Sequence, residues 1–453
     1  MPLIRTDKLS TTVFCFRRDL RLHDNPALQA ALAHADHIAF CYVLTDDHLT
    51  QAPNRLAYLV ASLRALDDAL DGQLWLRSGN FNDEILAVAT EVGANQVHLC
   101  HDYRPEVSDE QLTEMLAHKG IELVRTGSPY AVAPGRIVKN DNTPYKVFTP
   151  FYRTWLEHGW RLPPGKPENI TPVQAPRKKW PSAGKPLVPA GEDAARARWH
   201  DFLTNKLHEY PEARDRPGYS GTSHASVALN FGELHPRTLL ADISKKRSEG
   251  AHVMRRELAW REFYADVLFR APETVNVSLD SVASKVQTDS GAHADKIFAL
   301  WQEGKTGYPI VDAGMRQLAH TGWMHNRVRM IVASFLVKDL HVPWQWGAEH
   351  FMDLLLDGDP ASNSHNWQWV AGTGTDAAPY IRVFNPTLQS KKFDPEGDYI
   401  RTHVPELAEM EGKYLHEPWR HPDGPPSGYP APIVDHAEER REALQRFEAA
   451  RTS

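Results

Sequence analysis

The first quarter of the chain alternates short apolar runs with segments of helical spacing. The apolar runs, between Thr11 and Thr126, are TTVFCF, HIAFCYVL, QLWLRS, QVHLCH and IELVRT. The segments between them, such as NRLAYLVASLRALDDAL, repeat apolar residues with the period of a helix. Strands separated by helices of this length are typical of a parallel sheet that is covered on both faces. We therefore predict an α/β domain over residues 1–127.

The pattern changes after this domain. Residues 128–193 contain many prolines and glycines and little periodicity, which predicts an extended connector. Residues 194–453 have a helical pattern with stop signals between segments, and Pro236 suits the first turn of a helix. A last, charged helix is expected from Val434 to Ala450. The chain is thus predicted to join a sheet domain, through a long connector, to an all-α domain.

Length and composition agree with two globular domains, because 453 residues are too many for one core. No apolar run reaches the length of a membrane span, and the first residues, MPLIRTDKLSTT, lack the apolar core of a secretory signal. We expect no membrane contact and a cytoplasmic location. The net charge of −7 argues against a uniformly basic surface but leaves room for a local basic groove.

The three cysteines, Cys15, Cys41 and Cys100, form no CxxC pair. Their odd number and spacing argue against a disulfide framework and a four-cysteine iron–sulfur site. We expect them to be buried as small apolar residues, and we expect no metal site.

The stretch DGDPASNSHNWQWVAGTGTD, residues 357–376, combines carboxylates, amides and indoles at unusual density. Such a mixture indicates a site. Each feature also has a structural interpretation, because Trp367 and Trp369 could be core residues and Asp357 and Asp359 could cap a helix or form a turn.

Further blocks resemble one known family. They lie at residues 16–26 (FRRDLRLHDNP), 257–264 (ELAWREFY), 306–318 (TGYPIVDAGMRQL) and 321–330 (TGWMHNRVRM). Together with residues 357–376, these blocks resemble the DNA photolyase and cryptochrome family, most closely the bacterial class I photolyases that act on cyclobutane pyrimidine dimers. The resemblance implies an α/β antenna domain joined to an all-α FAD-binding domain.

The resemblance implies FAD as the cofactor. It pairs Arg329 with Asp357 beside the flavin ring and places Asn363 opposite flavin N5, where plant cryptochromes have an aspartic acid. The small residues from Gly221 to Ser226 suit a phosphate, although a helix cap explains them equally well. The FAD-binding residues implied are Tyr210, Thr222, Ser223, His224, Ala225, Ser226, Arg261, Arg329, Asp357, Asp359 and Asn363.

The resemblance also implies damaged DNA as the substrate, with the lesion swung out of the duplex into a pocket. An enzyme cannot reach the reacting atoms of a base while the base is stacked inside the duplex. The pocket and phosphate contacts implied are Glu257, Trp260, Asn326, Arg327, Met330 and Trp369. As a structural alternative, Glu257 and Trp260 would form an ordinary pair on one helix face. The (6-4) photolyases have histidine where this chain has Asn326 and Met330, which favours the cyclobutane dimer.

The implied reaction is a carbon–carbon lyase reaction driven by light, with an electron lent by reduced FAD to the dimer and then returned. The catalytic residues implied are Glu257, Asn363, Trp344 and Trp367. Trp367 and Trp344 match the inner and middle members of the family's tryptophan chain. The resemblance places the outer member about ten residues before the tryptophan matched by Trp301. The outer member is missing, because residues 289–293 (DSGAH) contain no tryptophan, tyrosine or phenylalanine. Trp346, Trp323 or a tyrosine could replace it.

The sequence differs from the family pattern at two places that concern the flavin and the antenna chromophore. Ser364-His365-Asn366 stands where bacterial relatives have Asn-Gly-Gly, which demands ordinary backbone angles beside the flavin. Residues 106–110 (EVSDE) only approximate the folate-binding stretch of the family and could equally cap a helix. The antenna is therefore methenyltetrahydrofolate, a deazaflavin or none.

Two functions follow as expectations. The first is light-driven repair of cyclobutane pyrimidine dimers by a monomer, and the alternative is a cryptochrome-type photoreceptor that binds FAD and signals through partners. Asn363, the set of pocket residues and a chain that ends at its last helix favour repair. The arginines Arg17, Arg18 and Arg21 are expected to hold the structure together rather than to bind DNA.

Overall fold

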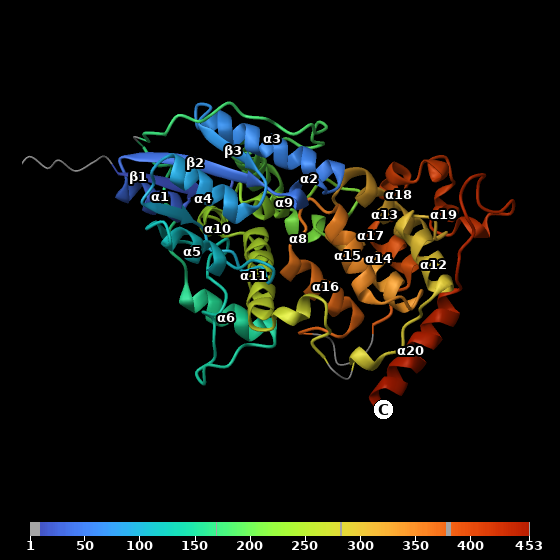
Figure 1. Ribbon diagram of the computed structural model, residues 1–453. Helices are drawn as coiled ribbons and strands as arrows, with labels where there is room; N and C mark the ends of the chain where they lie inside the picture. The colour runs from blue at the N-terminus through green and yellow to red at the C-terminus, as the bar shows by residue number, and fades with distance from the viewer. Residues whose placement is uncertain (1–9, 169, 281–282, 377–381, 453) are drawn as a thin grey trace, which may run out of the picture. The chain divides into compact units, whose positions relative to one another are not determined.

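The computed structural model of the protein describes residues 10–168, 170–280, 283–376 and 382–452. The chain forms two compact units, which Figure 1 draws with their helices and strands. Unit 1 consists of Met1–Ile137, Trp155–Leu203 and Ser223–Arg247, and unit 2 of Val138–Thr154, Thr204–Thr222 and Ser248–Ser453. Residues 1–9, which belong to the stretch searched for a secretory signal, lie outside the described residues.

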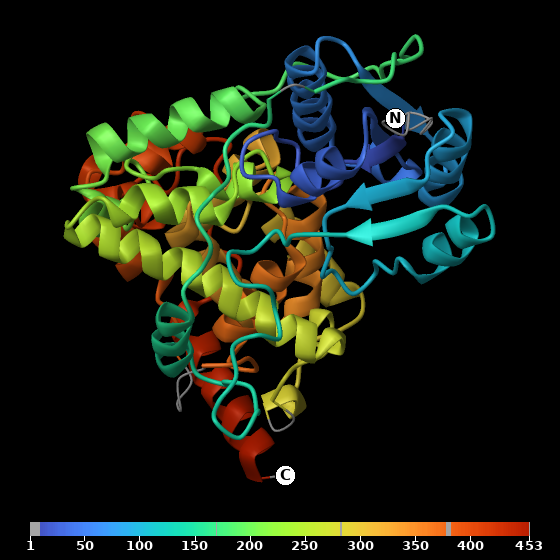
Figure 2. The same cartoon turned by 90° about the vertical axis from the view of Figure 1, so that its left-hand side faces the viewer.

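Unit 1 contains the predicted parallel sheet. Its five strands have the order β3-β2-β1-β4-β5, and all four neighbouring pairs are parallel. The strands are β1 (Thr11–Cys15), β2 (His37–Leu44), β3 (Leu74–Ser78), β4 (Gln96–Leu99) and β5 (Glu122–Arg125). Figure 2 shows β4 and β5 as adjacent parallel arrows. Each strand lies within one predicted apolar run, so the α/β prediction is confirmed.

Helices connect the strands of this sheet, as the parallel arrangement requires. They are α1 (Pro26–His34), α2 (Asp46–Leu49), α3 (Pro53–Ala69), α4 (Phe81–Glu91) and α5 (Glu110–Ala117). Helices α4 and α5 cover one face, where Ile85 and Leu112 pack with Val13 and Cys41 of the strands. Since side chains alternate along a strand, Phe14 points to the other face, where it is fully buried. All three cysteines are buried and free, as expected.

The remaining helices of unit 1 include segments that lie far beyond the sheet in sequence. They are α7 (Glu192–Asp201), α9 (Ala225–Phe231) and α10 (Pro236–Ser244), while the π-helical turn η1 (Phe202–Lys206) crosses the boundary between the units. Glu233, between α9 and α10, is fully buried and accepts hydrogen bonds from Tyr58 Oη (2.7 Å) and Ser62 Oγ (2.8 Å) of α3. Burial raises the pKa of this carboxyl. The segment that holds Glu233, expected to belong with the helical domain, is thus tied to α3.

The sequence predicted an extended connector over residues 128–193, but part of this stretch is helical. It contains helix α6 (Phe148–His158), whose aromatic residues Phe148, Phe151 and Trp155 are buried, so burial of an apolar face stabilises a helix there. Farther along, Thr171 and Val173 hydrogen-bond to Ile38 at the start of β2. This part of the stretch therefore pairs with the start of β2, before the point where β3 joins that strand.

The arginines of the N-terminal signature are structural, as expected. Arg17 binds Asp109 (2.8 Å), Arg18 binds the side chain of Asn230 (2.8 Å), and Arg21 donates to the carbonyl of Gly232 (2.9 Å). All of these contacts lie within unit 1. The signature thus joins the end of β1 to the segment around α9.

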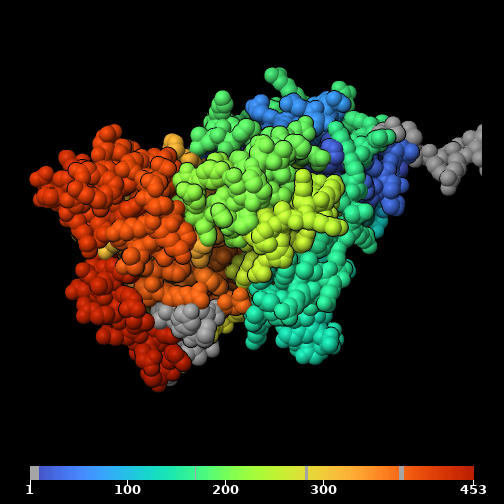
Figure 3. Space-filling model, turned by 180° about the vertical axis from the view of Figure 1, so that it is seen from behind, coloured from blue at the N-terminus to red at the C-terminus, as the bar shows by residue number. Residues whose placement is uncertain are grey.

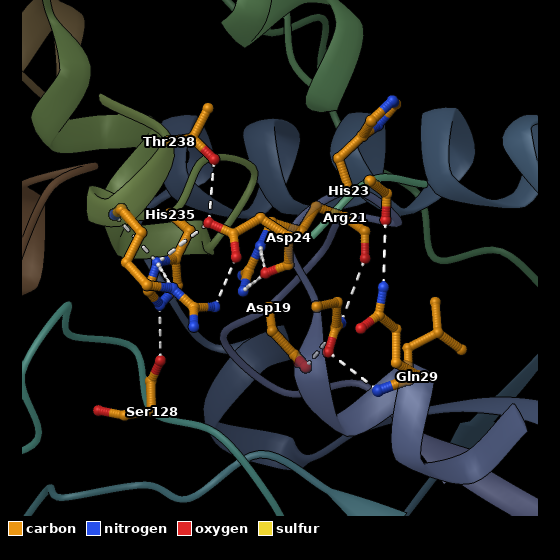
Figure 4. Close-up of polar contacts among 12 residues, drawn as sticks. Asp19, Arg21, His23, Asp24, Gln29, Ser128, His235 and Thr238 are labelled. Atoms are coloured by element: carbon orange, nitrogen blue, oxygen red, sulfur yellow. Dashed lines mark hydrogen bonds and ion pairs between the residues drawn. The ribbon is translucent and has the colours of Figure 1, made fainter. Parts of the chain in front are cut away.

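Asp24 anchors the next part of the same signature (Figure 4). Its carboxylate accepts hydrogen bonds from Arg237 (2.5 Å) and Thr238 Oγ1 (2.9 Å) at the start of α10. His235 beside it bonds the carbonyl of Ser128 through Nε2 (2.7 Å), and burial lowers the pKa of this histidine to about 4. The neutral imidazole and the Arg237–Asp24 pair therefore fix α10 against the N-terminal loop.

Unit 2 is helical, as predicted. Its helices are α8 (Tyr210–Ala213), α11 (Glu249–Arg270), α12 (Ala292–Gln302), α13 (Pro309–Thr321), α14 (Asn326–Lys338), α15 (Trp344–Leu354), α16 (Pro360–Ala371), α17 (Pro386–Phe393), α18 (Asp398–His403), α19 (Gly412–Leu415) and α20 (His436–Thr452). Short 3₁₀ turns lie between some of them, at η2 (Pro272–Val275), η3 (Ala283–Lys285), η4 (Pro405–Leu407) and η5 (Pro418–Arg420). One apolar core, which includes Trp301, Trp344 and Trp367, runs through α12 to α16.

The last helix begins two residues later than expected and continues to Thr452. Two contacts hold it against the segment after α14, between His436 and Asp339 and between His341 and Glu439 (2.8 Å). Within the described residues, we find no helix that is both long and apolar enough to cross a membrane.

Gly232 is a position where a side chain should be costly. Its φ is +70°, and a Cβ would lie 2.0 Å from the carbonyl oxygen of Arg18. We expect Gly232→Ala to lower the free energy of unfolding of unit 1 by about 3 kcal/mol, the sum of backbone strain and a backbone clash. Urea denaturation followed by circular dichroism measures the loss.

Gly93 provides the matched control. Its φ is +64° and nothing lies within 4 Å of a Cβ there, so Gly93→Ala should cost about 1 kcal/mol from backbone strain alone. Equal losses for the two variants would show that the contact with Arg18 is unimportant.

Candidate functional site

Helix α16 lies at the centre of the predicted site. Asp359 caps it, accepting a hydrogen bond from the backbone N–H of Ser362 (2.9 Å). The helix packs against α11, α14 and α15, which carry most of the other predicted residues. Figure 3 shows the yellow-green residues of α11 and the orange residues of α14 to α16 on one face of the molecule. Because Trp367 and Trp369 are on a helix, they point in different directions, and only Trp367 is fully in the core.

Arg329 of α14 and Asp357 form the predicted ion pair. Arg329 Nη2 lies 3.0 and 2.9 Å from the two carboxylate oxygens, and Arg329 Nε donates to the carbonyl of Met324 (2.8 Å). The Asp357 side chain is only 3% exposed. A buried carboxylate of this kind is stable only when paired, so the pair places two fixed opposite charges beside α16.

Asn363 is buried and has a fixed orientation. Its side-chain Nδ2 donates to the carbonyl of Ala348 in α15 (2.9 Å). Because a carbonyl accepts and never donates, this bond identifies the amide nitrogen. The other end of the amide therefore presents Oδ1, a hydrogen-bond acceptor.

The residues predicted to bind the FAD phosphates are divided along the chain between the two units, between Thr222 and Ser223. Tyr210 begins α8 and Thr222 follows it, both in unit 2. Ser223 to Ser226 belong to unit 1, where Ser223 Oγ accepts a hydrogen bond from the N–H of Ala225 (3.2 Å) and His224 precedes α9 with a φ of +51°. This bond is local to the turn before α9, and the N-cap residue His224 makes no side-chain cap hydrogen bond.

Two ion pairs hold predicted pocket residues in place. Glu257 of α11 binds Arg214 (2.7 Å), and Arg327 of α14 binds Asp215 (2.6 Å). Both partners directly follow α8. Arg214 and Asp215 were not among the predicted residues, because nothing in the local sequence pattern distinguishes them from other surface charges.

Trp260 of α11 is stacked on another ring. Its indole lies parallel to Phe148, with the ring centroids 3.7 Å apart and the planes inclined by 7°. The guanidinium of Arg256 lies 5.6 Å from the centroid of the same Phe148 ring. Phe148 was missed because it lies in the stretch expected to be extended.

The other predicted DNA contacts are at or near the surface of unit 2. Asn326 is exposed at the start of α14, and Met330 and Trp369 are half-buried. Arg327 contacts Met330 Sδ (3.5 Å), and its guanidinium lies 4.5 Å from the centroid of Phe393. Arg261 lies half-buried on α11.

The tryptophans predicted to conduct electrons are buried. Trp367 contacts Trp301 and Phe351 edge to face, with centroids 6.2 and 5.0 Å apart. Trp344 begins α15 and donates from Nε1 to Ser278 Oγ (3.1 Å). Trp346, suggested as a replacement for the missing outer member, is half-buried and packs against Phe298 (5.3 Å).

The unusual Ser364-His365-Asn366 sequence lies inside α16, so its backbone is ordinary helix. His365 is fully buried and stacks on Tyr264 of α11, with centroids 5.7 Å apart. Burial lowers the pKa of His365 to about 4, so the imidazole is neutral at physiological pH. Ser364 Oγ donates to the carbonyl of Val275 (2.9 Å). These side chains therefore join α16 to its neighbours.

In unit 1, acidic residues of the stretch 106–110, which was compared with folate-binding sequences, form ion pairs with nearby arginines. Asp109 forms an ion pair with Arg17, and Glu106 Oε1 lies 3.7 Å from Arg104 Nη1. Asp109 precedes α5 but does not cap it with its side chain.

Comparison with known proteins matches this arrangement. Residues 12–175 match the family model described as DNA photolyase, and residues 254–449 match the FAD binding domain of DNA photolyase. The deoxyribodipyrimidine photo-lyase of Streptomyces griseus is 41% identical over 98% of this chain and 99% of its own. That of Escherichia coli is 40% identical over the same shares.

Solved structures give the same result. A class III photolyase from Agrobacterium tumefaciens is 36% identical, with a TM-score of 0.89 over all of both chains. A cryptochrome from Synechocystis is 28% identical, with a TM-score of 0.87 over 97% of this chain and all of its own. The chain combines an α/β part with an all-α part, and the all-α part contains an FAD-binding domain. It belongs to the DNA photolyase family.

The residues present fit an FAD. The buried Arg329–Asp357 pair supplies fixed charges, and the oriented Asn363 amide supplies an acceptor, which are the kinds of group that bind the polar edge of a flavin ring.

Breaking the Arg329–Asp357 pair should destabilise unit 2. We expect Arg329→Ala to lower the free energy of unfolding by about 3 kcal/mol, because it leaves Asp357 charged and buried. Adding Asp357→Ala should restore part of the loss. Thermal and urea unfolding of the apoprotein measure both.

Arg316→Ala serves as the control. Arg316 pairs with Glu406 (2.7 Å), whose side chain is 28% exposed against 3% for Asp357, so its loss should cost about 1 kcal/mol. A similar effect of the two arginine variants would contradict a special role for the buried pair.

Proposed function

We propose that this protein repairs cyclobutane pyrimidine dimers in DNA by light-driven electron transfer. The observation that carries the proposal is the packing of α11, with Glu257 and Trp260, against α16, with Asn363 and Trp369. The residue set for a lesion and the residues expected at the flavin ring thereby lie in one unit. Electron transfer needs this kind of proximity, which a fixed helix pair provides.

When bound, FAD supplies light absorption and the electron that opens the dimer. The protein contributes position and charge. Arg329 and Asp357 would supply a constant field to the bound flavin, and Asn363 Oδ1 would be its hydrogen-bond acceptor. A neutral acceptor suits a protonated flavin N5, the form found in reduced flavin. The chain's amide at this position thus supports the repair-competent redox state.

The proposed lesion site uses an aromatic face, a carboxylate and a cation. Phe148 covers one face of the half-exposed Trp260 indole, so that the other face is offered to a base. Glu257 is held by Arg214 at a side-chain exposure of 32%, where it can accept hydrogen bonds from pyrimidine edges. Arg327 lies at the start of α14 in a position to contact a phosphate.

The class and the antenna are finer points of the proposal. The curated relatives are named deoxyribodipyrimidine photo-lyases, and Asn326 and Met330 favour the cyclobutane dimer over the (6-4) lesion. A class I assignment stays a prediction, since one similar solved structure is called class III. A second chromophore in unit 1, folate or deazaflavin, is also proposed. An archaeal photolyase described with two FAD molecules is 28% identical to this chain.

The similarity to the Synechocystis cryptochrome supports one alternative, an FAD photoreceptor that signals through partners. The two functions differ in what light does to damaged DNA. Only the repair enzyme restores pyrimidines.

The deciding experiment is the loss of dimers from ultraviolet-irradiated oligothymidine. The purified protein, with FAD bound and chemically reduced, is illuminated with blue light and compared with a dark sample. We expect light-dependent recovery of thymine. If none is recovered, the same assay on a (6-4) lesion separates a different repair enzyme from a photoreceptor.

Glu257→Ala should lower the repair yield roughly tenfold, because the lesion loses a polar partner as charge develops on it. The flavin absorption of the variant should equal that of the unchanged protein. Glu249→Ala, an exposed residue on the first turn of the same helix, is the control and should leave repair unchanged. Loss of FAD from the Glu257 variant would instead assign this residue to the fold.

A further inference from the structure

Unit 2 contains a cavity of about 370 Å³ beside the tryptophans. Trp344 and Trp346 line it from α15, and Ala443 and Arg446 line it from α20. Its volume is suitable for a small molecule. The exposed residues Ser284, Gln287 and Thr288 lie at its rim, so a solute can enter from solvent.

The charges around this cavity favour an anion. Lys338, His341 and Arg446 line it, and no carboxylate is among the lining residues that the structure describes. Lys338 is 5% exposed, and its Nζ donates to the carbonyl of Arg382 (2.5 Å). Burial lowers the pKa of this amine to about 8. The carbonyl is a neutral partner, so Lys338 keeps a positive charge that a bound anion would stabilise.

Arg446 and His341 are held by acids from outside the lining. Arg446 binds Asp289 (2.6 Å) and Glu442 (2.8 Å), and His341 binds Glu439. These acids fix the orientation of the two basic side chains.

The cavity lies at the interrupted end of the tryptophan series. Its wall at Gln287 and Thr288 directly precedes residues 289–293, where the outer tryptophan is missing. Ser278, which accepts the Trp344 Nε1 hydrogen bond, also lines it. Farther inward, the Trp367 ring packs on Gly347, one turn of α15 beyond Trp344. A ligand in the cavity would therefore contact the outermost indole of the series directly.

We propose that this cavity binds a small planar anion that serves as a one-electron reductant of Trp344, in place of an outer aromatic residue. Two indoles line the cavity, Lys338 favours a negative charge because its hydrogen-bond partner is a neutral carbonyl, and Arg446 supplies further N–H donors. An ene-diolate such as ascorbate has the required chemistry. This inference rests on the proposed photochemical function.

The electron transfer balances in one step. When Trp344 gives an electron to oxidised Trp367, Trp344 becomes a radical cation. The anion in the cavity then reduces Trp344 to the neutral indole. The ene-diolate monoanion loses one electron and releases its remaining acidic proton to water, which leaves a radical anion. No bond of the protein is made or broken. The consequence is that the hole cannot return to Trp367.

The test uses full-length protein with FAD bound and ascorbate as the probe. In the dark, titration calorimetry should show one saturable site. Under blue light, the rate of flavin photoreduction should rise hyperbolically with ascorbate and level off at the same concentration. Calorimetry requires no photochemistry, and dimer repair by chemically reduced protein requires no ascorbate, so failure of this inference and failure of the proposed repair function are distinguishable.

Two variants and a control locate the site. Ala443→Phe, which fills the cavity without changing a charge, should abolish saturable binding, and Arg446→Gln should weaken it about tenfold. Arg441→Gln, on an exposed part of the same helix, should leave it unchanged. A photoreduction rate linear in ascorbate, or equal binding by the Ala443→Phe variant, would overturn the proposal. Circular dichroism confirms that each variant is folded.

Discussion

The site depends on the requirement that polar side chains buried by α16 find hydrogen-bond partners. Gln368 is fully buried, donates to the carbonyls of Thr274 (2.7 Å) and Val277 (3.2 Å), and accepts from the N–H of Leu279 (2.9 Å). Asn363 is bonded in the same way to α15. Unsatisfied, each of these groups would cost about 1–3 kcal/mol. The helix therefore fixes the loop after α11, and this loop holds Ser278 against Trp344.

A second consequence of burial concerns charge. Arg214 and Arg327 are both neutralised by carboxylates, which explains how a chain with a net charge of −7 can display cations near a proposed DNA site without a basic surface. Ion pairs at this exposure contribute little to stability. Their main effect is to hold long side chains in one orientation before a ligand arrives.

Local patterns predicted the fold well and the site in part. The alternation of strands and helices, and the buried cysteines, follow from short-range periodicity, which the sequence displays directly. The Arg329–Asp357 pair was predicted only through the family resemblance. Phe148, Arg214 and Asp215 could not be predicted, because their partners lie 43 to 112 residues away and depend on how helices pack. The attachment of residues 223–247 to unit 1 was missed for the same reason, since Glu233 reaches across to α3.

Gly347 limits how this part of the molecule can evolve. A Cβ at this position would lie 2.2 Å from the Trp367 ring, and another atom of the same ring and Leu336 are almost as near. A side chain could therefore be accepted only if a smaller ring replaced Trp367, and the smaller ring alone would leave a void. Neither change is tolerable by itself. Positions 347 and 367 should therefore change together when related sequences diverge. The innermost indole of the series and the glycine that contacts it should be kept or replaced as a pair.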